Sequence, residues 1–181
     1  MQIGCTKKLL DFLKKDGQPY DKESDPFYRW TANLILVNRR KTMIVINDAV
    51  RCGFVLYGLT APVRKQLDQH LREGIYQTLL AENIAPQLVE KYLEDCGETI
   101  TYTKTGDRSV VSSLNQLILD LEFYDEPWDE EQIYQPEVSR AISGIIYSVR
   151  GKYYIVKDEL KRQFEEHYCN GSDTGKQMPS D

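Results

Sequence analysis

Three consecutive cations, Arg39, Arg40 and Lys41, follow Asn38 at the point where two apolar runs meet. A guanidinium binds a phosphate or carboxylate through two parallel hydrogen bonds, and neighbouring arginines raise the local positive potential. The tripeptide is therefore a candidate anion-binding site. Charges at a hairpin tip also discourage aggregation of apolar strands, and we keep this second explanation open.

A second candidate lies at a predicted strand-to-helix junction, where Lys104 and Arg108 flank Gly106 and Asp107 and are followed by Ser109. A glycine turn before a helix presents free backbone N–H groups to an anion. Lys104 and Arg108 add charge and Ser109 adds a hydroxyl, although the spacing of a P-loop is absent. As an N-cap, Asp107 would occupy the same N–H groups, so a well-capped helix is the alternative.

Two further cations, Lys7 and Lys8, fall in the first turn of a helix that we expect after Thr6. Cations at that position oppose the helix dipole, so either solvent screens them or they face something anionic. The complete set of candidate anion-binding residues is Lys7, Lys8, Arg39, Arg40, Lys41, Lys104, Arg108 and Ser109.

Other chemistry has weaker support in the sequence. His70 and His167 are far apart, and the acidic run 120–131 lacks the ligand order of an EF-hand, so we expect no metal site and no cofactor. Cys5 lies beside Lys7 and Lys8 at a predicted helix N-terminus, an environment that lowers a thiol pKa. No base is identifiable, and a small buried residue at a strand end is the alternative. Catalytic residues stay unassigned.

The four cysteines, Cys5, Cys52, Cys96 and Cys169, are widely spaced and form no Cys-x-x-Cys pair. This usage favours reduced thiols in a cytoplasm over a zinc site or a secreted disulfide framework. Residues 1–15 lack the long apolar stretch of a signal peptide, and no apolar run approaches the length of a membrane span. We therefore expect a cytoplasmic protein with no membrane partner.

The charge of the chain is uneven. The net charge is −5, but residues 1–60 hold ten Lys and Arg against six Asp and Glu, whereas residues 61–181 hold thirteen against twenty-two. A basic N-terminal third on an acidic body favours local binding of nucleic acid or of an acidic or phosphorylated ligand, while the net charge discourages indiscriminate binding. Mixing of both signs over the folded surface is the alternative.

The apolar periodicity of the 181 residues predicts one α+β domain with a mostly antiparallel central sheet. The run 120–131 is expected to be a solvated linker. We expect a core domain over 1–125, an extension of the same domain over 126–168 and a disordered tail over 169–181. The expected elements are a meander over 31–58, strands near 2–5 and 98–104, helices near 61–81, 86–96 and 107–123, and a C-terminal hairpin followed by a last helix.

Four blocks of the sequence together resemble a family of short bacterial proteins catalogued only as a domain of unknown function. The resemblance covers roughly residues 1–125 and implies a cytoplasmic protein of a bacterium or a mobile element. It implies no activity, cofactor or catalytic residue. The blocks are GCTKKLL at 4–10, WxANL through NRRK at 30–41, LYGL at 56–59 and TYTKTxDRS at 101–109.

Three functions fit these observations. The first is a binding module that docks an anionic partner, either nucleic acid or a phosphate-bearing ligand, through the basic N-terminal third. The second is an enzyme acting on a phosphate-containing substrate, with Asp48 or Asp107 as base, which requires the cations and a carboxylate to converge in one pocket. The third is a protein-interaction or inhibitor protein that uses the acidic C-terminal half. The oligomeric state is left open.

Overall fold

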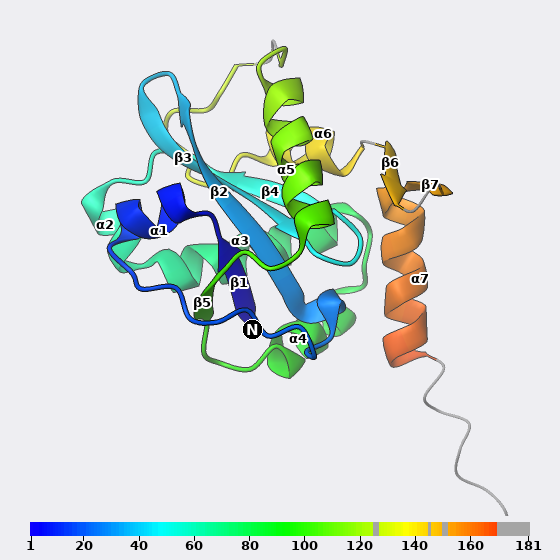
Figure 1. Cartoon of the computed structure of the whole chain (residues 1–181). Helices are drawn as coiled ribbons and strands as arrows, with labels where there is room; N and C mark the ends of the chain where they lie inside the picture. The colour runs from blue at the N-terminus through cyan, green and yellow to red at the C-terminus, as the bar shows by residue number, and fades with distance from the viewer. Residues whose placement is uncertain (125–126, 145, 150–151, 170–181) are drawn as a thin grey trace, which may run out of the picture.

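A five-stranded sheet in the order β4–β3–β2–β1–β5 forms the centre of the fold (Figure 1). The computed structural model describes residues 1–124, 127–144, 146–149 and 152–169. The predicted antiparallel meander and the α+β class are confirmed, and β1 joins the meander in parallel between β2 and β5. The strands are β1 (Gln2–Cys5), β2 (Arg29–Val37), β3 (Arg40–Asn47), β4 (Gly53–Leu56) and β5 (Thr101–Lys104).

The β2–β3 hairpin follows directly from its sequence. Val37 pairs with Arg40, and both residues between them have a positive φ, 47° for Asn38 and 64° for Arg39. Two positive φ values define the type I′ turn, whose twist matches that of the flanking strands. Residues 42–47 of β3 are buried on both faces of the sheet, as expected for a central strand covered on two sides.

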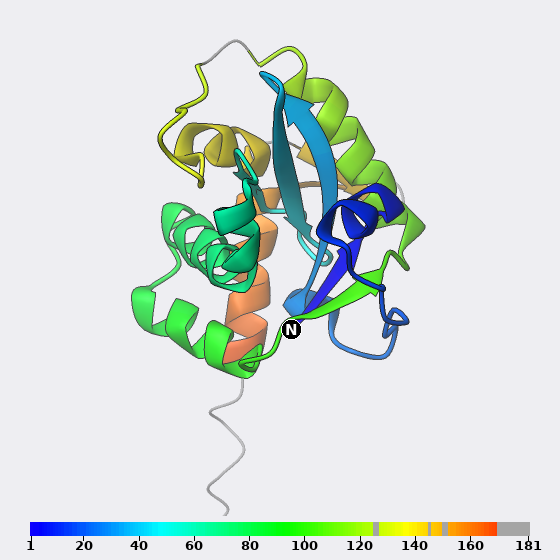
Figure 2. The ribbon, with the colours of Figure 1, turned by 90° about the vertical axis from the view of Figure 1, so that its left-hand side faces the viewer.

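Helices cover both faces of the sheet, and Figure 2 shows α3 and α4 on the side opposite to α5. The first face packs against α3, α4 and α7 around Trp30, Phe54 and Leu71, and the second packs against α5 and α6 around Ile44 and Val55. The predicted helix over 61–81 divides at Gln66, and the short helix α6 was not predicted. The helices are α1 (Lys7–Leu13), the 3-10 turn η1 (Pro26–Tyr28), α2 (Ala61–Lys65), α3 (Leu67–Ala81), α4 (Pro86–Asp95), α5 (Arg108–Leu121), α6 (Pro136–Ser143) and α7 (Val156–Tyr168).

A buried polar network lies at the end of β3, where the chain turns into β4. The Asp48 carboxylate, 5% exposed, accepts hydrogen bonds from Thr31 Oγ1 at 2.7 Å and from Tyr20 Oη at 2.9 Å. Arg29 Nε lies 3.7 Å from Asp48 Oδ2, and the Arg51 guanidinium donates to the Asp48 backbone carbonyl. Both arginines are buried, so the network places three charged groups inside the protein.

The C-terminal hairpin and last helix are confirmed as a two-stranded sheet of β6 (Ile146–Val149) and β7 (Lys152–Ile155), followed by α7. Helix α7 packs on the core through aromatic residues. The Phe164 ring lies 5.1 Å from the Phe27 ring in an edge-to-face contact, and the His167 ring stacks on Phe27 at 4.1 Å. His167 Nε2 also lies 2.8 Å from Asp25 Oδ2. The tail predicted from residue 169 onward lies, beyond Cys169, outside the described residues.

Candidate anion-binding surface

Helix α1 is held at the carboxyl end of β1 by contacts with β2. Thr6 N donates to Ala32 O at 3.1 Å, and Thr6 Oγ1 donates to Asn33 Oδ1 at 2.7 Å. Thr6 stands at the N-cap position, but its hydroxyl bonds to Asn33 and caps no helix N–H group. Lys7 and Lys8 therefore occupy an exposed first turn, where Lys7 Nζ pairs with Asp11 Oδ2 at 2.7 Å.

Contacts of α1 bring further cations to the same end of the molecule. The Arg64 guanidinium, from α2, donates to Phe12 O at 3.3 Å and lies 4.8 Å from the centre of the Phe12 ring. Lys15 Nζ lies 4.3 Å from the centre of the Tyr102 ring of β5. Lys104, two residues further along β5, donates its backbone N–H to Gln18 O at 2.9 Å.

Figure 1 shows the hairpin extending past α1 and α2. Leu59 N, just before α2, donates to Lys41 O at 2.7 Å, and Lys8 and Asn38 line one hollow. Asp11 and Asp16 are the carboxylates of the α1 segment. We call the exposed and half-exposed cations of this region the basic end; they are Lys7, Lys8, Lys14, Lys15, Arg39, Lys41, Arg64, Lys65 and Lys104.

Four of these cations, at positions 14, 15, 64 and 65, were not among the sequence candidates. The signal for the first pair was present, because Lys14 and Lys15 directly follow the amphipathic turn that carries Lys7 and Lys8. The second pair had no comparable signal. Arg64 and Lys65 reach the basic end because α2 packs beside α1, a contact between segments far apart in the chain.

Arg40 does not belong to the basic end, although it follows Arg39 directly. Its Nη2 pairs with Glu130 Oε2 at 2.6 Å and its Nη1 donates to Glu130 O at 3.1 Å. The same guanidinium lies 5.4 Å from the centre of the Tyr57 ring, which also contacts Trp128. Residues 127 and 129–131 of the expected solvated linker are exposed, but Trp128 is half-buried and Glu130 neutralises one arginine of the hairpin.

Arg108 and Ser109 lie away from the basic end. Arg51 Nη2 donates to Ser109 Oγ at 3.4 Å, and Arg51 is in the turn between β3 and β4, at the other end of β3 from Arg39. The eight residues of β3 span roughly 25 Å. Asp107 Oδ1 accepts from Ser109 N at 2.8 Å and from Val110 N at 3.3 Å, so the junction is a capped helix whose first N–H groups are occupied.

Comparison with known proteins agrees with the blocks of sequence described above. Residues 2–159 match the family described as a domain of unknown function, DUF6933. The chain belongs to this family. The resemblance noted in the sequence is confirmed, and the match continues past residue 125 through β7 into α7. No curated protein and no solved structure matches this DUF6933 chain.

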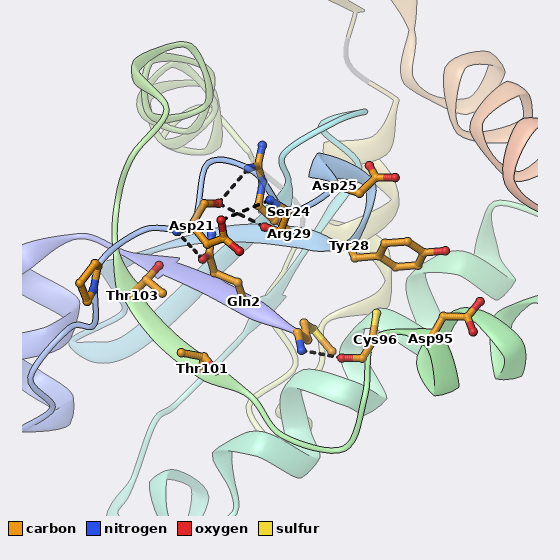
Figure 3. A pocket seen from close by; sticks show the side chains of 12 residues that line it. Gln2, Asp21, Ser24, Asp25, Tyr28, Arg29, Asp95, Cys96, Thr101 and Thr103 are labelled. Carbon is orange, nitrogen blue, oxygen red and sulfur yellow. Dashed lines mark hydrogen bonds between the residues drawn. The ribbon is translucent and has the colours of Figure 1, made fainter.

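A hollow of about 370 Å³ near the amino end of β1 shows the opposite electrostatic character (Figure 3). Three carboxylates line it, those of Asp21, Asp25 and Asp95. Arg29 also lines it, but the Arg29 guanidinium donates to the backbone carbonyls of Asp21 and Lys22 at 3.0 and 3.1 Å. This hollow of the DUF6933 domain therefore does not suit an anion.

The convergence that an enzyme would need is not found among the described residues. Asp48 is buried beneath Tyr20 and Thr31, and Asp107 caps α5, so neither carboxylate faces the basic end. In the same part of the chain no group of three or more His, Cys, Asp or Glu side chains is arranged to hold a metal ion. No helix there is both long and apolar enough to cross a membrane.

Cys5 is not an activated nucleophile in this DUF6933 domain. Its side chain is 1% exposed, and burial raises the pKa of the thiol to about 12, outweighing the nearby Lys15. Of the two alternatives for Cys5, the small buried residue at a strand end is confirmed, because Cys5 belongs to the core while Lys7 and Lys8 are exposed. Burial likewise raises the pKa of Cys52, and that of Cys96 to about 11.

These environments predict the reactivity of the thiols toward a disulfide reagent such as DTNB at pH 8. We expect one fast equivalent, from the exposed Cys169, and three thiols that react only when the protein unfolds. Cys169→Ser should remove the fast phase. A fast phase that persists in Cys169→Ser and maps to Cys5 would contradict the buried placement of that thiol.

Proposed function

We propose that this DUF6933 domain is a binding module that docks a polyanion, a nucleic acid in the first instance, on the basic end. The observation that carries the proposal is the gathering of exposed cations on α1, α2 and the hairpin, with Lys104 at the end of β5, in an acidic protein. Such a patch concentrates a polyanion locally while the net charge of −5 repels it elsewhere.

The arrangement favours an extended anion over a small phosphate-bearing ligand. The cations are exposed or half-exposed and are spread over the hairpin, α1, α2 and the end of β5. A small-molecule site needs a concave pocket with convergent polar groups. Exposed lysines instead suit the repeated charges of a phosphodiester backbone, because contacts with the phosphates need no fixed geometry at each position.

The experiment measures binding of a fluorescent single-stranded RNA and of the corresponding DNA duplex by anisotropy between 25 and about 200 mM salt. We expect affinity at low salt that falls steeply as salt rises, because each neutralised phosphate releases counterions. Lys41→Gln combined with Lys104→Gln should weaken binding at least ten-fold and flatten the salt dependence, since each lysine neutralises about one phosphate.

The matched control is Lys22→Gln combined with Lys161→Gln, which changes the net charge equally at exposed positions outside the basic end. The control should bind within about two-fold of the wild type, because a charge more than a Debye length from the polyanion is screened. Absence of any affinity for RNA, DNA or inorganic polyphosphate at low salt would refute the proposal. Equal losses in both double variants would mean that net charge, rather than the basic end, governs binding.

A further inference from the structure

A hollow of about 370 Å³ lies between helices α3 and α4, on the side of the sheet opposite to α5 (Figure 2). The wall that it exposes is mainly apolar, and its large apolar side chains are Tyr76 of α3 and Leu93 of α4. Both are half-buried and pack against the main core, so part of each side chain stays uncovered. An apolar recess between two surface helices is a common place for a partner to dock.

Three exposed glutamates line the hollow beside these apolar residues. Glu90 and Glu94 lie one turn apart on α4, and Glu98 follows the end of that helix. None of the three forms an ion pair within the described part of the chain. Lys91, the cation between them on α4, pairs instead with Asp95 at 3.6 Å. The negative charge of the glutamates is therefore available to a partner.

The surrounding charge is also negative. Arg72 lines the hollow, but its guanidinium donates to the Gly97 carbonyl oxygen, just beyond the end of α4. Residues 67–98, from α3 to the turn after α4, hold seven Asp and Glu against two Lys and Arg. The resulting charge of −5 equals that of the whole chain. The field of this segment attracts a cationic partner and repels a nucleic acid.

We propose that the hollow between α3 and α4 binds a basic amphipathic helix of a partner protein. An amphipathic helix docks by placing the apolar side chains of one face in a groove. A leucine or similar side chain of the partner contacts Tyr76 and Leu93, and Lys or Arg one turn away pairs with Glu90 and Glu94. A polyamine or a metal ion would leave the apolar wall unused. None of the residues that line the hollow belongs to the basic end, so this proposal is independent of the polyanion proposal.

The probe is a fluorescent synthetic peptide of about 18 residues, long enough to form a helix, with leucines on one face and lysines on the other. Anisotropy measures its binding to the full chain at about 50 mM salt, where exposed charges are only partly screened. We expect the peptide to bind. A scrambled peptide of the same composition should bind about ten-fold more weakly or worse, because its leucines no longer share one helix face.

A double variant locates the site. Glu90→Gln combined with Glu94→Gln should weaken binding about five-fold or more, because two ion pairs with the peptide are lost. The matched control is Glu122→Gln combined with Glu131→Gln, which changes the net charge equally at exposed positions outside the hollow. The control should bind the peptide within about two-fold of the wild type. Both double variants should melt at the wild-type temperature, since all four side chains are exposed.

Four outcomes would overturn the proposal. The first is absence of peptide binding, and the second is equal affinity for the scrambled peptide, which would mean that charge alone attracts it. The third is an equal loss in the two double variants. The fourth is self-association of the protein without peptide that is lost in Glu90→Gln combined with Glu94→Gln, since the basic end of a second copy would then occupy the hollow. The polyanion measurements vary Lys41 and Lys104 and fail or succeed separately.

Discussion

Replacing Asp48 by alanine is expected to destabilise the protein by about 3–5 kcal/mol, because it leaves Arg29 and Arg51 buried without a counter-charge. The two arginines are 7% and 3% exposed, so solvent cannot replace the lost carboxylate. The hydroxyls of Thr31 and Tyr20 would lose their acceptor as well, at a further cost for buried donors without partners. The measurement is the free energy of unfolding in urea, followed by circular dichroism and by tryptophan fluorescence.

Two controls separate burial from charge. Asp48→Asn keeps the shape and one acceptor oxygen, and should cost less than half as much as the alanine. Asp11→Ala removes a shorter ion pair, that with Lys7, from an exposed position and should change stability by no more than about 0.5 kcal/mol. Equal losses for Asp48→Ala and Asp11→Ala would contradict the assignment of a buried network.

The same carboxyl group predicts a dependence on pH. Burial raises the pKa of Asp48 above its ordinary value of 3.8, although Thr31, Tyr20, Arg29 and Arg51 act in the opposite direction. A raised pKa means that the folded state binds the proton more tightly than the unfolded state. The part of the stability that is linked to protonation of Asp48 is thus full below the ordinary pKa and is lost as the pH rises through the folded pKa. Relative to Asp48→Asn, the wild type should gain stability as the pH falls toward 3.8.

Phe164→Ala is expected to destabilise the whole domain by about 3–5 kcal/mol, or roughly 6–20 °C in melting temperature, because it empties an aromatic core position. Phe164 is 2% exposed and contacts the rings of Phe27, Tyr92 and Tyr168. Since Phe27 and Tyr92 belong to the main core, the loss should appear in a single unfolding transition rather than in detachment of α7 alone.

The control is Tyr153→Ala on β7, whose ring is 79% exposed, and it should leave the melting temperature nearly unchanged. Calorimetry of both variants is the measurement. A Phe164→Ala protein that melts at the wild-type temperature, with only a small early loss of helix signal, would show that α7 unfolds separately from the sheet.

The elements that were predicted correctly are those with a strong local pattern. The meander follows from alternating and continuous apolar runs around Asn38 and Asn47, and α5 follows from Val110, Leu114 and Leu117 behind the Asp107 cap. Helix α6 was missed because its eight residues offer few apolar positions, chiefly Val138 and Ile142, and its stability comes from packing on Val55. Likewise, nothing local indicates that Gln66 divides the helix predicted over 61–81.

The sequence indicates which cations are candidates for the site, but it does not indicate which of them the fold brings together. Cations at 7, 8, 39 and 41 lie on α1 and the hairpin and Lys104 lies at the end of β5, and their placement depends on the parallel position of β1 and on the α1–α2 contact through Arg64. Arg40 and Ser109 were lost from the group through contacts with Glu130 and Arg51, residues distant in the chain. Such long-range pairings are set by the whole fold rather than by neighbours in sequence.

The position of β1 between β2 and β5 has a consequence for how the chain folds. Gln2–Cys5 pairs on one side with β2 and on the other with Thr101–Lys104, so the sheet is complete only after residues far apart in the chain have met. Contacts of high sequence separation close slowly, because loop entropy is lost before they form. During synthesis the meander can form while the edge of β1 that faces β5 stays unpaired. Unpaired strand edges of this kind promote aggregation with other chains. We expect folding of this domain to have a slow step that ends when β5 closes the sheet.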